Sequence, residues 1–135
     1  MKTRMNHPDI ELYTGYFAKL VVYKQHRLYP VSIAKYMPRG VTIPELPSAA
    51  PSQELLRAYK TGTVTTAEYD TIYRNDLTTH FNPAHLQEII DTARRMSYQG
   101  VVFVCYERPE SFCHRHIFAD YLNKNFGENV TEFRV

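Results

Sequence analysis

The stretch Gly100–Asn125, GVVFVCYERPESFCHRHIFADYLNKN, decides the fold of this chain. Val101–Val104 is an unbroken apolar and mostly β-branched run, typical of a strand that is buried on both faces in a parallel sheet. Tyr106–Ser111 is polar and contains a proline, so it predicts a loop. From about Phe112 the apolar spacing is helical, and Gly127 is placed to end the helix. The stretch therefore predicts a strand, a loop and a helix in succession.

Both cysteines of the chain lie beside the predicted loop. Cys105 ends the apolar run, and Cys113 lies in the first turn of the predicted helix. In open α/β sheets, ligands bind outside the carboxyl ends of the strands. A helix start adds free backbone N–H groups and partial positive charge, which favour an anion. The segment Cys113-His114-Arg115 is therefore the predicted centre of a binding site.

Length, composition and charge limit the class of protein. The 135 residues suit one domain, and 44% hydrophobic residues are enough for a core. A net charge of +2 argues against nucleic acid as a partner without excluding it, and it suits a compact anion such as a nucleotide phosphate. No apolar stretch approaches the ~18 residues of a membrane span, Met1–Ile10 lacks the apolar segment of a signal peptide, and two cysteines do not make a secreted disulfide framework. We therefore expect a cytoplasmic protein without membrane association, and its oligomeric state stays open.

The rest of the chain alternates short strands with helices. Ile10–Tyr16 and Tyr29–Ala34 are predicted strands, whereas Phe17–Tyr23 fits either a continued strand or a short helix. Met1–Asp9 is polar and is expected to be a flexible start. The predicted fold is a single α/β domain over residues 1–135, with a small, mainly parallel sheet flanked by helices. Lys35 would then lie near the carboxyl end of the second strand.

Tyr36–Pro51 is a long loop with four prolines. A loop of this length is often a lid or a binding loop. A stiff surface crossover explains the prolines equally well, and the sequence does not decide between the two.

Three helices follow, each with a recognisable start. Ser52 can cap the first, 65–68 (TTAE) is a capping box for the second, and Asn82 followed by proline begins the third. The positions predicted to be buried on the second and third helices are Tyr69, Ile72, Tyr73, Leu77, Leu86, Ile89, Ile90 and Ala93. Val130–Val135 is the predicted last strand.

Cys113 is the sharpest candidate for chemistry. The helix end, the imidazole of His114 and the guanidinium of Arg115 would each lower the pKa of its thiol and produce a nucleophilic thiolate. The alternative is that Cys113 packs as a small apolar residue. Cys105 follows a buried run and is expected to be structural. A Cys105–Cys113 disulfide is also conceivable, and it would be transient in a reducing compartment.

Charged and aromatic residues complete the predicted site. Glu107 can act as an acid, a base or an acceptor for a ribose hydroxyl, and Arg115 can clamp a carboxylate or phosphate. The alternative is a structural bridge between these two residues. The predicted catalytic residues are Cys113 and Glu107, and the predicted ligand-binding residues are Tyr13, Tyr16, Lys19, Lys35, His114 and Arg115.

Other classes of site fit the sequence less well. Cys113 and His116 lie one helical turn apart, but no second pair of metal ligands stands out, so we expect no metal and no other cofactor. Arg115 follows Cys113 too closely for the phosphate loop of a cysteine phosphatase. Gly-rich dinucleotide motifs, Walker loops and nucleophilic serine elbows do not occur in the chain.

Two segments carry a resemblance to a known family. CYERP at 105–109 followed by CHRH at 113–116 resembles the Cys-x-Glu…Cys-His-Arg signature of the family called domain of unknown function 488 (DUF488). Residues 13–19 and 32–35 are similar to its first two strands, and residues 46–59 and 65–73 are similar to its phage and bacterial branch. The resemblance implies a small cytoplasmic α/β domain and names no reaction.

Three hypotheses of function are compatible with the sequence. The first is an enzyme that acts on a nucleotide-like or phosphorylated ligand through Cys113 or Glu107. The second is a non-catalytic module that binds such a ligand or another protein. The third is a thiol redox sensor that uses Cys105 and Cys113.

Overall fold

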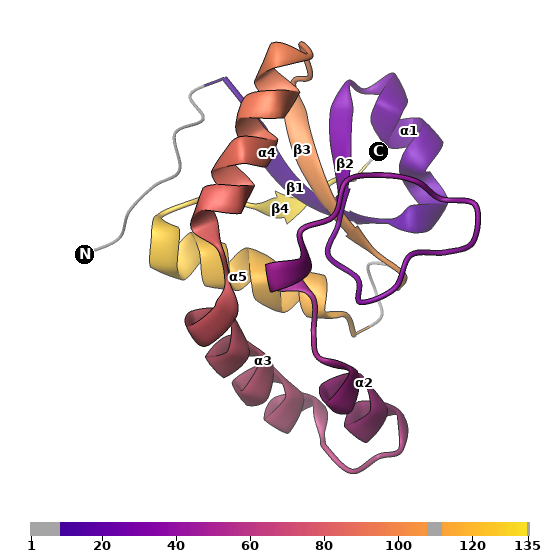
Figure 1. The fold of residues 1–135 in the computed structure, drawn as a ribbon, viewed down its shortest axis with the longest axis vertical. Helices are drawn as coiled ribbons and strands as arrows, with labels where there is room; N and C mark the ends of the chain where they lie inside the picture. The colour runs from indigo at the N-terminus through magenta and orange to yellow at the C-terminus, as the bar shows by residue number, and fades with distance from the viewer. Residues whose placement is uncertain (1–8, 108–111, 135) are drawn as a thin grey trace.

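The computed structural model describes residues 9–107 and 112–134. It has the predicted α/β fold, with a four-stranded sheet in which paired strands run parallel in the order β2-β3-β1-β4 (Figure 1). The strands are β1 (Glu11–Tyr16), β2 (Leu28–Ser32), β3 (Gly100–Cys105) and β4 (Thr131–Glu132). Of the start expected to be flexible, all but Asp9 lies outside the described residues.

Strand β3 is the centre of the fold, because β1 and β2 both pair with it. All of its residues are buried, as the apolar run predicted. Val101 and Phe103 belong to a large core on one face of the sheet, and Val102 and Val104 belong to a smaller core on the other. The absence of polar alternation in this strand follows from burial on both faces.

Helices cover both faces of the sheet (Figure 1). On one face lie α4 (Pro83–Arg95) and α5 (His114–Phe126), and α3 (Thr66–His80) packs against α5. On the other face lies α1 (Leu20–Gln25), which follows a 3-10 turn and packs beside β2. The ambiguous segment Phe17–Tyr23 is therefore helical and does not continue the strand.

A close approach between Gly15 and Tyr23 positions α1 on the sheet. The Tyr23 hydroxyl accepts a hydrogen bond from the backbone N–H of Tyr16 at 2.9 Å. A Cβ atom at Gly15 would lie 2.3 Å from that hydroxyl oxygen, well inside van der Waals contact. Glycine is required here because the backbone must come this close to a buried tyrosine.

The predicted starts of the three helices that follow the proline-rich segment are confirmed. Ser52 caps α2 (Gln53–Lys60) by accepting from the backbone N–H of Leu55, and Asn82 caps α4 in the same way. The capping box of Thr65 and Glu68 is complete at the start of α3. The predicted core positions on α3 and α4 are buried except Ile72, whose exposure is 39%. The prediction for Ile72 was wrong because α3 lies at the edge of the domain. Other elements cover only part of the surface of this helix, and Ile72 lies on the uncovered part.

The proline-rich segment 36–51 is anchored in its second half. Glu45 forms a parallel bridge with Ser32, and Leu46 is fully buried. A short 3-10 helix, Pro47–Ala49, follows, and the Tyr73 hydroxyl donates to the carbonyl of Ala49. These contacts fix the second half as a crossover between β2 and α2.

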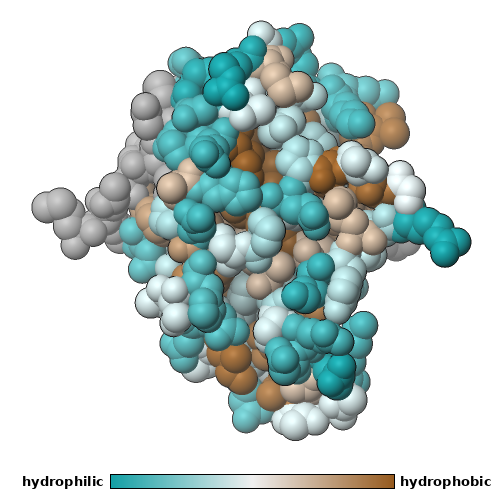
Figure 2. Space-filling model, in the orientation of Figure 1, coloured by the Kyte–Doolittle hydropathy of each residue, from teal (hydrophilic) through white to brown (hydrophobic). Residues whose placement is uncertain are grey.

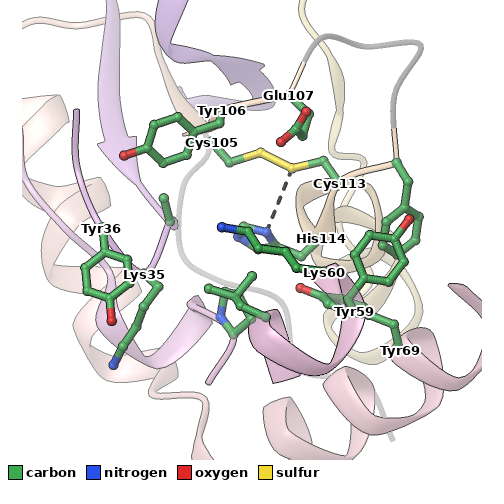
Figure 3. Close-up of a pocket in the computed structure, with 14 residues that line it drawn as sticks. Lys35, Tyr36, Tyr59, Lys60, Tyr69, Cys105, Tyr106, Glu107, Cys113 and His114 are labelled. Atoms are coloured by element: carbon green, nitrogen blue, oxygen red, sulfur yellow. Dashed lines mark hydrogen bonds between the residues drawn. A yellow bond between two sulfur atoms is a disulfide. The ribbon is translucent and has the colours of Figure 1, made fainter. Parts of the chain in front are cut away.

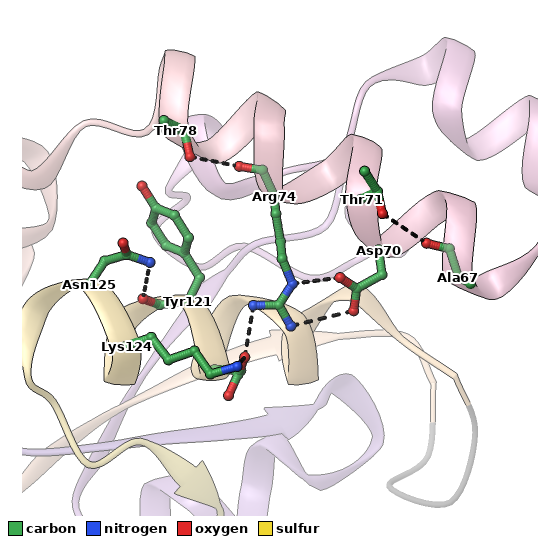
Figure 4. Close-up of polar contacts among 9 residues, drawn as sticks. Ala67, Asp70, Thr71, Arg74, Thr78, Tyr121, Lys124 and Asn125 are labelled. Carbon is green, nitrogen blue, oxygen red and sulfur yellow. Dashed lines mark hydrogen bonds and ion pairs between the residues drawn. The ribbon is translucent and has the colours of Figure 1, made fainter.

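Ionic contacts join α3 to α5 (Figure 4). Arg74 of α3 donates to Asp70 one turn earlier and, at 2.7 Å, to Asp120 of α5. Burial raises the pKa of the Asp120 carboxyl, but hydrogen bonds from Lys124 and Arg74 outweigh it and hold that pKa below its usual value. Helix α5 then ends as predicted at Gly127, whose φ of 66° is left-handed.

The last strand is shorter than the predicted Val130–Val135: among the described residues only Thr131 and Glu132 pair with β1, and Val135 lies outside those residues. On the face shown in Figure 2, hydrophobic residues form small separate areas among hydrophilic ones. In the described part of the chain, no helix combines the length and apolar character needed to cross a membrane.

Candidate functional site

A cavity of about 460 Å³ lies at the carboxyl ends of β2 and β3 (Figure 3). The chain after β2 contributes Lys35 and Tyr36, and α2 contributes Tyr59 and Lys60. The junction of β3 and α5 contributes both cysteines and His114. The volume is within the usual range of small-molecule sites, and the position is the one expected for ligands of a parallel sheet.

Cys105 and Cys113 form a disulfide that lines this cavity. Both residues are buried. The disulfide that the sequence made conceivable is therefore present, and in this state Cys113 is not a free thiolate. Cys113 also lies just before the helix and not in its first turn, because its backbone is extended and α5 begins at His114.

His114 is buried and has a defined hydrogen-bond partner. Its Nε2 lies 2.6 Å from the carbonyl oxygen of Ile33. Because a carbonyl only accepts, Nε2 carries the proton and donates it. The other ring nitrogen, Nδ1, is then unprotonated and lies 3.8 Å from Sγ of Cys113. Burial lowers the pKa of the imidazole to about 4, so the ring is neutral near pH 7.

Arg115 is fully buried, and its main partner is Glu132 of β4. Nε donates to one carboxylate oxygen at 3.0 Å and Nη2 to the other at 3.2 Å. Nη1 donates to the backbone carbonyl of Glu107 and, at 3.0 Å, to Sγ of Cys105. The sequence allowed a bridge between the side chains of Arg115 and Glu107. In the structure Arg115 contacts the backbone carbonyl of Glu107 instead.

A family model described as the active DUF488-N3 subclade matches residues 22–126. The chain belongs to the DUF488 family. The match extends from α1 to the end of α5 and includes the cavity and both cysteines. No curated protein and no solved structure is detectably similar to the chain. Placement in a phage and bacterial branch of DUF488 stays a prediction.

The cavity of this DUF488 protein brings together four of the eight predicted site residues, Lys35, Glu107, Cys113 and His114. Lys35 follows β2, and Glu107 is exposed two residues after β3. Figure 3 shows the Glu107 carboxylate beside the disulfide.

The other four predicted residues do not line the cavity. Tyr13 packs against Phe133 on the face that α1 covers, with ring centroids 5.1 Å apart. The ring of Tyr16 lies 5.7 Å from the Arg115 guanidinium, so these two residues contact each other. Lys19 is exposed on the 3-10 turn. The rings of Phe17, which follows β1, and Tyr106, which follows β3, pack edge to face with centroids 5.1 Å apart.

Sequence reasoning missed the aromatic wall of the cavity. Tyr59 of α2, Tyr69 of α3 and Phe112 pack edge to face or tilted, with centroids 5.0–5.5 Å apart. Tyr69 was predicted as core, and it is buried, but it also lines the cavity. Tyr59 and Lys60 have no signal in the sequence, because only the path of the chain through the segment 36–51 brings α2 over the cysteines.

The charged groups around the cavity favour an anion. Among the residues that the structure describes, Lys35 and Lys60 line it with a single carboxylate, that of Glu107. Neither lysine forms an ion pair with any residue among those the structure describes. A cavity with two cationic side chains and an aromatic wall suits a ligand that combines a ring with a negative group.

Among the described residues, one set of side-chain atoms is close enough together to hold a metal ion, and it lies at the cavity. The two cysteine sulfurs and a ring nitrogen of His114 all lie within 4.8 Å of one another. This set differs from the Cys113 and His116 pair that the helical spacing suggested. It includes Cys105 because the end of β3 lies beside the start of α5.

Proposed function

We propose that the cavity binds a nucleotide-like or phosphorylated small molecule, and that the protein is an enzyme whose chemistry depends on the reduced cysteines. The observation that carries the proposal is the juxtaposition in one cavity of an aromatic wall, two lysines and the cysteine–histidine cluster. The family description "active" adds support for an enzyme.

The aromatic wall and the lysines divide the task of binding. A base or other flat ring packs against Tyr59 of this wall or against Tyr36, which also lines the cavity. Stacking of this kind contributes about 1–3 kcal/mol per base. The negative group of the ligand lies between Lys35 and Lys60. Arg115 has no part in this binding, because its guanidinium is used by Glu132 and the Glu107 carbonyl.

The reactive group comes from the cysteines once the disulfide is reduced. Nδ1 of His114 is unprotonated, it is 3.8 Å from Sγ of Cys113, and the Ile33 carbonyl holds the opposite side of the ring. Nδ1 therefore presents its lone pair to the sulfur that reduction frees, and a third group fixes the orientation of the ring. Glu107 at the rim serves as an acid or base toward the bound ligand.

Thermal shifts of the reduced protein test the binding part. With nucleotides and inorganic phosphate at constant ionic strength, a ligand at a hundred times its Kd should stabilise the fold by about 2.7 kcal/mol. Lys35→Ala and Lys60→Ala should remove most of this effect, whereas the control Lys24→Ala on α1 should keep it. The absence of a specific shift with every phosphate-bearing compound would refute the ligand class.

Turnover tests the enzymatic part. Cys113→Ser and Glu107→Gln should abolish turnover of a ligand that still binds. Stoichiometric retention of an unchanged ligand by the wild type would instead establish a non-catalytic binding module.

A thiol redox switch is the second candidate, and the disulfide favours it. Mild oxidation of the reduced protein should then remove two hydrogen atoms from its mass and change ligand binding, and a dithiol reductant should reverse both. If oxidation leaves binding unchanged, the disulfide is not a switch for this site.

A further inference from the structure

We propose that in the reduced protein Cys105, Cys113 and His114 form a zinc site with three protein ligands and one open position toward the cavity. This proposal rests on the proposed function in one respect: zinc would be the cofactor of the same cavity. The binding of zinc itself requires no organic ligand.

The three donor atoms lie within 4.8 Å of one another, and Sγ of Cys113 and Nδ1 of His114 are 3.8 Å apart. The two sulfurs are bonded to each other in this state and must move apart on reduction before they bind an ion. Zn–S bonds of about 2.3 Å and Zn–N bonds of about 2.0 Å at tetrahedral angles place the donors roughly 3.5–3.8 Å apart. The Cα atoms of the two cysteines are 7.5 Å apart, wider than the ~4.4–6.8 Å usual for disulfides. This separation leaves room for an ion between two thiolates.

The histidine is oriented as a metal ligand. Nε2–H donates to the Ile33 carbonyl at 2.6 Å, which leaves the lone pair of Nδ1 toward the cysteine side. Ligating histidines almost always donate their other ring N–H to a carbonyl or carboxylate in this way, because that bond fixes the tautomer and the ring orientation. The burial of His114 holds it in place before the metal binds.

The charges of the cluster also suit zinc. Two thiolates, a neutral imidazole and Zn²⁺ sum to zero, which a buried position favours. Arg115 donates to Sγ of Cys105 at 3.0 Å, and a guanidinium at that place favours the thiolate form. The Glu132 carboxylate pairs with the same guanidinium, so the arginine adds no net charge to the cluster. Thiolate and imidazole donors together are typical of zinc.

No fourth donor belongs to the set among the residues 9–107 and 112–134, so the fourth position is left to a water molecule or the ligand. Glu107 lines the cavity but does not belong to the set of donor atoms. Three protein ligands with one open position are the pattern of catalytic zinc, in contrast to the four of structural zinc. A water molecule held there would lose a proton near neutral pH. The class of chemistry that this position suits is hydrolysis or transfer of a group on the bound ligand.

Zinc and the disulfide exclude each other at this site. A sulfur atom in the Cys105–Cys113 bond has no thiolate charge to give to a metal. The oxidised protein is therefore a matched control of identical sequence for the reduced one.

Metal titration of the untagged full-length chain tests the proposal. Disulfide-free protein, prepared with a phosphine and freed of reductant without air, is titrated with Zn²⁺ against a chromophoric chelator. The expected result is one zinc per chain in the reduced sample and none in the oxidised sample. With Co²⁺, the reduced wild type should show thiolate-to-cobalt charge transfer and the visible bands of tetrahedral cobalt, which report sulfur ligation without any substitution.

Variants then identify the ligands. Loss of a residue that only orients a metal ligand typically weakens metal binding by ~10–100-fold. We expect a larger loss of zinc affinity from each substitution of a ligand: Cys105→Ser, Cys113→Ser and His114→Ala. The control His80→Ala, on the exposed end of α3, should bind as the wild type does. Absence of zinc binding by reduced wild type, a cobalt spectrum without sulfur ligation, or full binding by the cysteine variants would overturn the proposal. Thermal shifts with phosphate-bearing ligands are measured separately, so failure of the zinc site and failure of the ligand class are distinguishable.

Discussion

Arg115 of α5 and Glu132 of β4 form a two-point ion pair inside the protein, with N–O distances of 3.0 and 3.2 Å. The Thr14 hydroxyl of β1 donates to the same carboxylate at 2.6 Å. The pair thus ties the helix that begins at the cavity to the edge strand of the sheet.

Removal of this arginine should destabilise the fold strongly. Arg115→Ala leaves the Glu132 carboxylate buried without its cation, so we expect a loss of about 3–5 kcal/mol in the free energy of unfolding. Urea denaturation measures it. Arg94→Ala, which breaks a half-exposed pair with Asp91, is the control and should cost at most about 1 kcal/mol. Equal effects of the two substitutions would contradict a structural role for Arg115.

Phe103 should be among the most sensitive positions of the core. It is fully buried at the centre of the sheet, and its ring lies 5.3 Å from that of Phe118. Phe103→Ala should therefore cost about 3–5 kcal/mol by leaving a cavity, whereas Ile72→Ala on the exposed side of α3 should cost much less. A thermal melt unchanged by Phe103→Ala would show that β3 is not central.

Gly15→Ala tests the contact with Tyr23. The new methyl would overlap the tyrosine ring, and such overpacking typically costs about 1–3 kcal/mol. Because the cost arises from this one contact, the substitution should cost much less when Tyr23 is already alanine. Equilibrium unfolding of both single variants and the double variant gives the coupling, and simple additivity would argue against the contact.

His114 should make the stability of the oxidised protein depend on pH. Burial lowers the pKa of its imidazole from 6.5 to about 4. The unfolded chain therefore takes up a proton at higher pH than the folded protein, so stability is complete above about pH 6.5 and falls as the pH drops toward 4. At about 1.4 kcal/mol per pKa unit, the loss over this window is about 3 kcal/mol.

Urea denaturation of the oxidised protein, with a metal chelator present, measures this change in stability. The pH is varied from about 7.5 to about 4, a range that covers the window between the unfolded and folded pKa values of His114. His85→Gln, a substitution far from the cavity, should keep the slope, and His114→Gln should remove most of it. A wild-type stability that does not change across the window would contradict the buried neutral imidazole.

The sequence by itself determined the elements whose signals are local. The apolar run of Val101–Val104 identified the central strand, because only a strand with two buried faces tolerates no polar alternation. The capping residues located the helix starts within one or two residues, because each cap satisfies N–H groups of its own first turn. The two cysteines were placed beside one cavity because they flank one short loop.

Only the tertiary structure decided which residues meet at that cavity. Glu132 becomes the partner of Arg115 because a helix and a turn carry the chain back to pair beside β1. Tyr59 and Lys60 reach the cysteines because the crossover at Leu46 sets the position of α2. Tyr16 and Lys19 are kept away because α1 packs on the opposite face of the sheet. These placements depend on the packing of segments distant in sequence, which the residue pattern of any single segment does not encode.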